Sequence, residues 1–345
     1  MASISHPRVL ITGATGFLGG YLVSEFADQG YQVVATGRKA QALAALADRG
    51  ASATVAAELT QLPGLADQIG PIDYVIHAAA LSTVWGPAED FILANVEGTQ
   101  AVIDLAQKAA VKRLVFISSP SIYSGRADRL AIKETEFDPD NHLNNYIRSK
   151  IIAERVVRAA VADGLDAVIL RPRGLFGVGD TSIIPRLIKV NGKIGIPLLR
   201  GGRGLVDMTC VENVALAARL AAEADGATGV YNITNGEPRP FKDLLDQFFA
   251  ELGQPPRYRA VPIQLAMAVA TTLETVYELA DLPGEPVLTR YLVCTLGYSQ
   301  TLDISRAQAD LGYQPRLSLD AGISQYIASL DAASSDDASL DVSRG

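Results

Sequence analysis

A short apolar run that enters a glycine-rich turn constrains this chain more than any other feature. Arg8 to Thr12 is predicted to be a buried strand, and residues 13–19 follow at once as Gly-Ala-Thr-Gly-Phe-Leu-Gly. A helical pattern then continues to Gln29, and Gly30 ends it. Glycines between a strand and a helix let backbone N–H groups approach a pyrophosphate, and the helix dipole favours the anion there. The context therefore predicts a dinucleotide site, although a tight turn without a ligand is the alternative.

The end of the next strand indicates which dinucleotide is bound. The strand Gln32 to Thr36 leads into Gly37, Arg38 and Lys39. An acidic residue near this point accepts from the ribose 2′-OH of NAD, whereas an arginine accommodates the 2′-phosphate of NADP. Gly37 stands at the acidic position and two cations follow it, so NADP(H) is preferred and NAD(H) is possible. Ordinary surface cations at a helix start are the alternative.

Strands continue to alternate with helices through the first half of the chain. Such alternation is typical of an α/β fold with a doubly wound, Rossmann-type parallel sheet, here with a smaller, mainly helical C-terminal substrate domain. One long helix is expected from about Glu89 to Ala110, and Gly98 inside it predicts a close packing contact. The further predicted strands are Ala53–Ala56, Tyr74–His77, Leu114–Ser118, Ala167–Leu170 and Val230–Thr234.

A tyrosine and a lysine four residues apart provide candidate acid–base chemistry. Tyr146 and Lys150 would share one face of a helix. A free tyrosine has a pKa of about 10, and a nearby ammonium favours its phenolate form. Ser119 and Ser121 follow the strand that precedes this helix, where ligands bind in such sheets. Chance occurrence on a surface helix is the alternative for the pair.

Composition excludes several other classes of function. A net charge of −8 over 345 residues gives no electrostatic footprint for nucleic acid. Two cysteines cannot form a disulfide framework, which together with an N-terminus lacking an apolar run predicts a cytoplasmic protein. No run of eighteen residues is free of polar side chains, so no membrane span is expected. The histidines and cysteines show no metal-ligand spacing, so no metal is predicted.

Six motifs in order resemble the extended short-chain dehydrogenases/reductases, and the resemblance spans Arg8 to about Leu330. The motifs that carry it are Thr12–Gly19, His77–Ala80, Asn95–Thr99, Ser118-Ser119, Tyr146-x-x-x-Lys150 and Arg171-Pro172.

The resemblance implies roles for individual residues. Tyr146 would donate and accept the proton, Lys150 would lower the pKa of that tyrosine and hold the nicotinamide ribose, and Ser119 would hydrogen-bond the substrate oxygen. Ser121 and Arg173 would contact the substrate. The residues expected to bind the cofactor are Gly13, Thr15, Gly16, Phe17, Leu18, Gly19, Arg38, Lys39, Glu58, Leu59, Ala78, Ala79, Ala80, Tyr146, Lys150, Pro172 and Gly174.

Within that family the chain looks closest to the 3β-hydroxysteroid dehydrogenase / sterol-4α-carboxylate 3-dehydrogenase branch, which includes bacterial 2-alkyl-3-oxoalkanoate reductases. Residues 286–291 and 303–315 carry this likeness. The resemblance implies interconversion of a ketone and a secondary alcohol on a large apolar substrate.

Two other functions are compatible with the same core. Nucleotide-sugar epimerases and dehydratases usually carry Arg-Asp-Phe where this chain reads Val206-Asp207-Met208, so their diphosphate clamp is missing. Other cations, namely Arg173, Arg200 or Arg203, could replace it. A cofactor-sensing regulator without turnover is the second alternative, but such proteins commonly lose the Tyr-x-x-x-Lys pair.

The chain is expected to divide into interleaved parts. Residues 1–180 would form the NAD(P)-binding domain, which residues 205–235 would rejoin. Residues 181–204 and 236–330 would form the substrate-binding region, with a glycine-rich loop over residues 195–204, and residues 331–345 a disordered tail. The apolar segment 260–280 is interpreted as a lid, as a helix docking on a membrane surface, or as ordinary core. A homodimer is expected.

Overall fold

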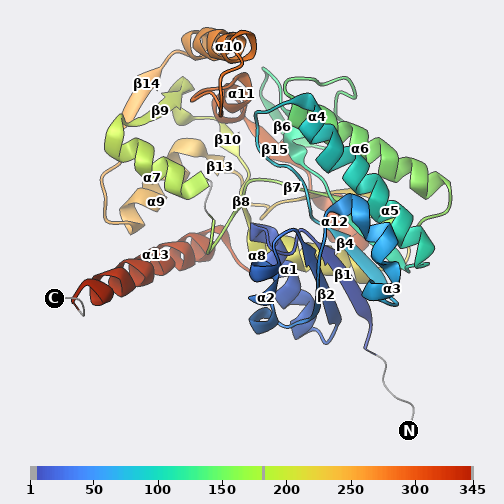
Figure 1. The fold of residues 1–345 in the computed structure, drawn as a ribbon. Coiled ribbons are helices and arrows are strands. Elements are labelled where there is room, and N and C mark those ends of the chain that lie inside the picture. The colour runs from blue at the N-terminus through green and yellow to red at the C-terminus, as the bar shows by residue number, and fades with distance from the viewer. Residues whose placement is uncertain (1–5, 181–182, 343–345) are drawn as a thin grey trace.

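The computed structural model describes residues 6–180 and 183–342, and a sheet of seven parallel strands forms its centre (Figure 1). The strands are β1 Arg8–Thr12, β2 Gln32–Gly37, β3 Ala51–Ala56, β4 Tyr74–His77, β5 Arg113–Ile117, β7 Ala167–Pro172 and β12 Gly229–Ile233. Their order is β12-β7-β5-β4-β1-β2-β3. The order reverses between β1 and β4, and ligands bind at the carboxyl ends of the strands at such a point. The sheet confirms the predicted doubly wound fold.

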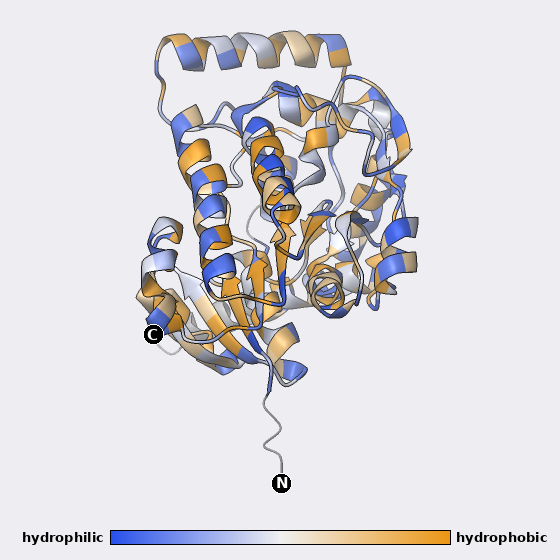
Figure 2. Ribbon diagram, turned by 90° about the vertical axis from the view of Figure 1, so that its right-hand side faces the viewer, coloured by the Kyte–Doolittle hydropathy of each residue, from blue (hydrophilic) through white to orange (hydrophobic). Residues whose placement is uncertain are grey.

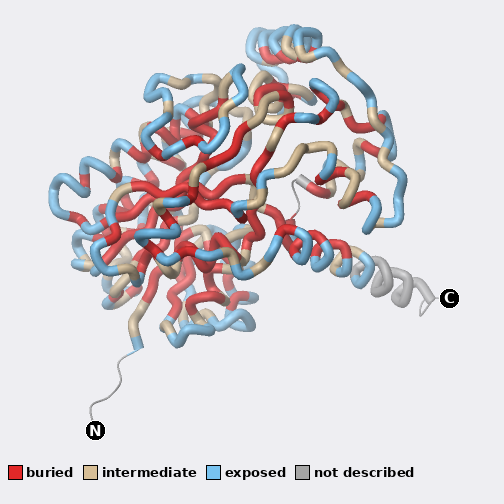
Figure 3. The backbone as a smooth tube through the Cα atoms, turned by 180° about the vertical axis from the view of Figure 1, so that it is seen from behind, coloured by how far each residue is buried: buried red, intermediate tan, exposed pale blue. Residues whose placement is uncertain are grey.

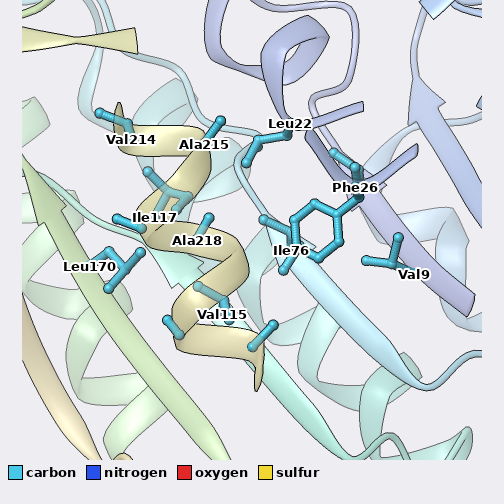
Figure 4. Close-up of a cluster of buried hydrophobic side chains, with 14 of the residues drawn as sticks. Val9, Leu22, Phe26, Ile76, Val115, Ile117, Leu170, Val214, Ala215 and Ala218 are labelled. Atoms are coloured by element: carbon cyan, nitrogen blue, oxygen red, sulfur yellow. The ribbon is translucent and has the colours of Figure 1, made fainter. Parts of the chain in front are cut away.

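Helices cover both faces of this sheet. They are α1 Phe17–Asp28, α2 Ala40–Ala44, α3 Ala66–Ile69, α4 Ala88–Phe91, α5 Gly98–Lys108, α6 Asn145–Ala162 and α8 Val211–Glu223, with the short 3-10 helices η1 Ala47–Arg49, η2 Leu59–Leu65 and η4 Pro120–Tyr123. On one face, Leu22 and Phe26 of α1 and Ala218 of α8 surround Val115 and its neighbours (Figure 4). On the other face α5 and α6 bury a second apolar cluster. The inner strands are buried on both faces and are almost continuously apolar, whereas exposed residues alternate along the edge strand β3.

The helix expected from Glu89 to Ala110 is interrupted, which corrects that prediction. A π-helical segment, η3 (Ile92–Glu97), lies between α4 and α5. At Gly98 an added Cβ would lie 2.7 Å from the side chain of Leu59, so the predicted close contact is present. The π-helical turn brings Asn95 inward, where its side chain is buried.

Beyond residue 180 short strands and helices replace the regular alternation. The helices are α7 Ile183–Lys193, α9 Phe241–Glu251, α10 Ile263–Leu279, α11 Arg290–Gly297, α12 Ser305–Leu311 and α13 Leu319–Val342, with η5 Arg200–Gly202. The strands outside the central sheet, of which the first two precede residue 180, are β6 Arg129–Ile132, β8 Leu175–Phe176, β9 Ile196–Leu199, β10 Leu205–Val206, β11 Thr209–Cys210, β13 Arg239–Pro240, β14 Tyr258–Val261 and β15 Gln300–Leu302. One small sheet has the order β13-β10-β15-β6, and it carries chain from both halves of the sequence. Strand β9 corrects the loop predicted over residues 195–204: its Ile and Leu side chains are buried against β14 and the neighbouring apolar cluster.

Helix α10 lies at the edge of the molecule, across the top in Figure 2. Ala266 and Ala270 pack inward, but Leu265, Val269 and Leu279 are exposed. The ordinary buried helix is therefore excluded as an interpretation of this segment. Among the described residues no helix is long and apolar enough to cross a membrane.

The C-terminal helix α13 extends into residues 331–345, where the sequence predicts a disordered tail, and that disorder stays a prediction. The helix projects away from the body (Figures 1 and 3), and it runs from Leu319 to Val342. Its first turns are anchored by the buried Leu319, Ile323 and Tyr326, and extending an established helix costs far less than starting one. Residues 343–345 of the predicted tail lie outside the described residues, as do residues 1–5 and 181–182.

Candidate active site

The glycine turn between β1 and α1 is shaped by its contact with the end of β4. Gly13 has a φ of +68°, and an added Cβ there would lie 2.7 Å from the backbone of Ala79. A Cβ on Gly19 would overlap the carbonyl oxygen of Gly13. Side chains at these two positions would therefore push the turn off β4 and close the approach to its backbone. The predicted cofactor residues 13–19 and 78–80 thus lie against one another.

The first turn of α1 has the properties of an anion site. Gly16 is the N-cap, and no side chain caps the helix. The first N–H groups of a helix have no partner inside the helix, so those of the first turn are available to a ligand. No acidic residue occupies that turn to repel an anion. These residues fit the pyrophosphate of a dinucleotide, held by the backbone of Phe17 and Leu18 at the positive end of the helix dipole.

Arg38 and Lys39 leave β2 beside this turn and are both exposed. Within the described ranges neither side chain takes part in a hydrogen bond or an ion pair. Gly37 is packed closely, because an added Cβ would lie 3.0 Å from Oγ1 of Thr15. Two unpaired cations therefore stand next to the turn, where a 2′-phosphate would be held.

Glu58 has a structural partner. Its carboxylate accepts from the backbone of Gln61, whose side chain in turn accepts from the backbone N–H of Glu58 at 3.0 Å, which makes a capping box for η2. The contact with adenine predicted for Glu58 stays a prediction. Leu59 fills the space in front of Gly98.

His77, at the end of β4, has both ring nitrogens bonded. Nδ1 lies 2.7 Å from Oγ1 of Thr12, and Nε2 lies 3.0 Å from Oγ1 of Thr99. Burial lowers the pKa of His77 to about 3, and the charge of Lys150 adds to the shift. The ring is therefore neutral and hydrogen-bonded, as expected for a structural histidine.

Tyr146 lies in the first turn of α6, where it is half-buried. The helix starts at Asn144, whose side chain accepts from the N–H of Ile147 at 2.8 Å. Burial raises the pKa of Tyr146 to about 12, a hydrogen bond with Ser119 opposes the shift, and the phenol of Tyr291 adds to it. The lowering of this pKa expected from Lys150 is not found, because burial outweighs any effect of the ammonium. The phenol is therefore protonated at neutral pH and hydrogen-bonded to Ser119, the residue that the resemblance assigns to the substrate oxygen.

Lys150 is buried one turn further along α6. Its ammonium donates to the carbonyl of Ile117 at 2.9 Å and lies 4.4 Å from the centroid of the Phe116 ring. Burial lowers the pKa of Lys150 to about 8, against the charge of Glu154. The ammonium is thus fixed at the carboxyl end of β5.

Ser119 and Ser121 connect to a residue that was not singled out from the sequence. The hydroxyl of Ser119 donates to that of Ser121 at 2.9 Å, and Oγ of Ser121 lies 2.7 Å from the phenolic oxygen of Tyr291. A hydroxyl chain therefore runs from Tyr146 through both serines to Tyr291 in α11. Tyr291 ends the segment 286–291 that carried the likeness to the hydroxysteroid dehydrogenase branch, which is the signal that could have found it.

A buried ion pair supports the site from below. Both oxygens of Glu154 accept from Arg171, at 2.8 and 2.6 Å, and the carboxylate also accepts from Ser118 at 2.6 Å. Arg171 further donates to Tyr123 and to a backbone carbonyl. Burial works against the charge of Glu154, but the contact with Arg171 prevails and its pKa is lowered. Sequence reasoning noted Arg171 and missed Glu154, which follows Lys150 by one helical turn and faces the same way.

The predicted anion-holding arginines separate into two groups. Arg173 follows β7 and is buried, with Pro172 and Gly174 on either side. Arg200 is half exposed and forms an ion pair with Asp128 at 2.7 Å, and Arg203 is exposed beside it. The side chain of Val206, which stands where related sugar-nucleotide enzymes carry an arginine, is buried in β10.

The described residues also lack a metal centre: they contain no group of three or more His, Cys, Asp or Glu side chains arranged to hold a metal ion.

Comparison with known proteins identifies the family. Residues 9–234, which run from β1 through β12 and include every motif named above, match the NAD dependent epimerase/dehydratase family. The chain belongs to this family. It is an enzyme of the extended short-chain dehydrogenase/reductase type with a Rossmann-like, NAD(P)-binding fold.

Among related sequences, the uncharacterized protein YbjS of Escherichia coli is 36% identical, over 93% of this chain and 97% of its own. The 2-alkyl-3-oxoalkanoate reductase of Stenotrophomonas maltophilia is 34% identical, over 93% of this chain and 99% of its own. The sterol-4-alpha-carboxylate 3-dehydrogenase of Candida albicans is 32% identical, over 93% of this chain and 97% of its own. These names agree with the branch expected from the sequence.

Among solved structures, MoeE5 in complex with UDP-glucuronic acid and NAD aligns with a TM-score of 0.74 at 27% identity, over 94% of this chain and 99% of its own. The crystal structure of gox2253 aligns with a TM-score of 0.78 at 24% identity, over 95% of this chain and 99% of its own. The shared fold therefore extends beyond the sheet to nearly the whole chain.

Proposed function

We propose that this enzyme is an NADP(H)-dependent oxidoreductase that interconverts a ketone and a secondary alcohol on a large apolar substrate. That substrate is either 3β-hydroxysteroid-like or a long-chain β-keto acid. The arrangement of Ser119, Tyr146 and Lys150 carries the proposal. One hydroxyl, one protonated phenol hydrogen-bonded to it and one buried ammonium meet where β5 ends and α6 begins.

The residues divide the chemistry between them. When bound, the nicotinamide supplies the hydride for reduction or accepts it in oxidation. Ser119 donates a hydrogen bond to the carbonyl oxygen and polarises it. Tyr146 gives its proton to that oxygen as negative charge develops there. Lys150 stabilises the resulting phenolate, because its charge favours the ionised form.

Two observations support the substrate class: position 206 carries no cation for a diphosphate, and two relatives are named for acids with a reacting C3. Val206 offers an apolar side chain where a diphosphate would need a cation. Two of the relatives are named for reduction or oxidation at C3 of an alkanoate and of a sterol carboxylate. Each additional buried methylene is worth about 0.8 kcal/mol, or roughly fourfold in kcat/KM, so a ketone series should gain stepwise until the pocket is full.

NADP(H) is proposed as the preferred cofactor because Arg38 and Lys39 are unpaired beside the glycine turn. A charge-assisted hydrogen bond contributes about 1.5–3 kcal/mol, so NADPH should bind about tenfold or more tightly than NADH. Arg38→Asp should flatten or reverse that order in fluorescence titrations. Arg155→Met, an exposed arginine on α6, is the matched control and should preserve it. Equal affinities in the unmodified enzyme would contradict the assignment.

The oxidation of NADPH, followed at its absorbance band, tests the reaction itself. Ketosteroids, long-chain β-keto acids and small aldehydes are offered in parallel, and turnover of one of the first two is expected. A nucleotide-sugar epimerase or dehydratase would instead retain NAD through turnover. Purified enzyme carrying tightly bound NAD, together with no ketone reduction, would favour that function over the proposed one.

A further inference from the structure

Arg173 is a buried cation that the fold leaves partly unsatisfied. Its side chain is only 7% exposed. One terminal nitrogen donates to the side-chain oxygen of Gln300 in β15, but Nε has no hydrogen-bond partner. None of the ion pairs within 4.0 Å among the described residues includes this guanidinium. A buried charge without a partner is costly, so a ligand that supplied an anion would relieve the cost.

The nearest acid does not neutralise Arg173. Asp207 influences the guanidinium from a distance, while its own Oδ2 accepts from the N–H of Leu302 at 2.7 Å. Burial raises the pKa of Asp207 to about 6, so this carboxylate becomes protonated at a higher pH than an ordinary aspartate does. Burial likewise lowers the pKa of Arg173. Asp207 and Arg173 are therefore not paired with each other. The positive guanidinium keeps an N–H group that can donate a hydrogen bond to a ligand.

Tyr291 links Arg173 to the hydroxyl groups of the proposed catalytic site. Although burial dominates the pKa of both groups, the phenol of Tyr291 is close enough to shift Arg173 and Tyr146 alike. The same phenol is bonded to Ser121 and through it to Ser119. Tyr291 therefore connects the hydroxyl chain of the site with the surroundings of Arg173.

We propose that Arg173 is the specificity-determining residue for a substrate carboxylate placed close to the reacting carbon, as in a β-oxo or β-hydroxy acid. This inference rests on the proposed function. A sugar-nucleotide diphosphate fits the geometry less well, because a whole sugar ring separates its phosphates from the reacting carbon. The flexible Arg200 is already paired with Asp128 and is not buried, so it does not compete for this role.

The test compares an acid with its neutral ester in the oxidation direction, because β-hydroxy acids are chemically stable. A long-chain 3-hydroxy acid and its methyl ester share the same alcohol and the same apolar chain. With NADP⁺ present, the unmodified enzyme should show a kcat/KM for the acid at least about tenfold above that for the ester.

Two substitutions separate charge from packing. Arg173→Met should lower kcat/KM for the acid about tenfold or more and leave that for the ester nearly unchanged, so that the preference disappears. Arg173→Lys keeps the charge and should retain part of the preference, even if Arg173→Met fails to fold. Arg259→Met removes an exposed arginine of β14 and serves as the matched control, with an unaltered ratio.

Three outcomes would overturn the inference. Equal kcat/KM values for acid and ester in the unmodified enzyme would show that no carboxylate is recognised, while leaving the ketoreductase proposal intact. An equal loss for both substrates in Arg173→Met would assign the residue to structure or to the cofactor. Oxidation of neither substrate, with turnover of a UDP-sugar, would remove the proposed function and this inference together.

Discussion

Burial shifts the two groups proposed to handle the proton in opposite directions. A free tyrosine and a free lysine have pKa values that nearly coincide at about 10. Here burial raises the pKa of Tyr146 to about 12 and lowers that of Lys150 to about 8. The tyrosine therefore carries its proton at neutral pH, and the lysine still carries its charge. That combination suits a phenol that must donate and an ammonium that must stabilise the phenolate left behind.

Removal of the Tyr146 hydroxyl should separate chemistry from binding. General acid–base catalysis is worth about 10²–10⁴-fold, so Tyr146→Phe should lower kcat by at least about 100-fold. NADP⁺ binding should hardly change, since the phenyl ring remains. Lys150→Ala should weaken both turnover and cofactor affinity. Steady-state kinetics and cofactor titration measure the two effects. Tyr31→Phe, far away and bonded to Glu223, is the control; retention of most activity in Tyr146→Phe would exclude the tyrosine as the acid.

The pKa of Lys150 predicts a pH dependence for ketone reduction. The ammonium is charged below about pH 8 and neutral above it. The kcat/KM for reduction should therefore fall as the pH rises through about 8, because the phenolate loses its stabilising charge. Initial rates at saturating NADPH across this range measure the profile. A rate that stayed level well above pH 8 would mean that the ammonium does not act on the phenol.

At the level of single elements, the ion pair between α6 and β7 should be a stability determinant. Glu154→Gln leaves the guanidinium of Arg171 buried without a counter-charge, and breaking such a pair costs about 3–5 kcal/mol. The free energy of unfolding, measured by urea denaturation, should fall by about that amount.

Arg158 provides a matched control for the same carboxylate. Its guanidinium lies 3.6 Å from Glu154 but its side chain is 47% exposed, so Arg158→Met should cost less than about 1 kcal/mol. If both variants lost the same stability, the buried pair would contribute no more than a surface one.

The regular elements of the sheet could be predicted because each strand is a short apolar run followed by a turn signal and an amphipathic helix. The π-helical interruption before Gly98 could not, since the residues from Ile92 to Glu97 show no local signal that distinguishes a π-helix from an α-helix. Strands β10 and β13 have two residues each, too few to show a period, and they pair across more than thirty residues of chain. Thr209, which lies two residues before α8, donates its hydroxyl to the carbonyl of Arg173, a partner that only the folded chain brings near.

The proposed catalytic residues Tyr146 and Lys150 could be predicted from the sequence for a related reason. Tyr146 and Lys150 are one helical turn apart, so a local pattern reveals them. Tyr291 and Arg173 are brought to the same place by the fold, from α11 and from the end of β7, and local spacing carries no trace of their proximity. The site is therefore assembled from both halves of the chain, although its best-marked residues all belong to the first.

At the scale of the whole molecule, the two halves meet at the proposed substrate position. Tyr291 contacts Ser121, and Gln300 contacts Arg173. A ligand bound there touches both halves and stabilises the folded chain by about 2.7 kcal/mol when its concentration is 100 times its Kd. The melting temperature is thus a direct measure of which substrate class fits.

With NADP⁺ present, a long-chain 3-hydroxy acid or a 3β-hydroxysteroid should raise the melting temperature more than a UDP-sugar does. The apolar ligands gain about 25 cal/mol for each Å² that they bury. The UDP-sugar would bring two phosphates to a position where β10 offers the buried side chain of Val206. Strong stabilisation by the UDP-sugar alone would mean that another cation holds the diphosphate. The effect of Arg173→Met on that stabilisation would then decide whether the buried guanidinium is that cation, and the enzyme would be assigned to nucleotide sugars.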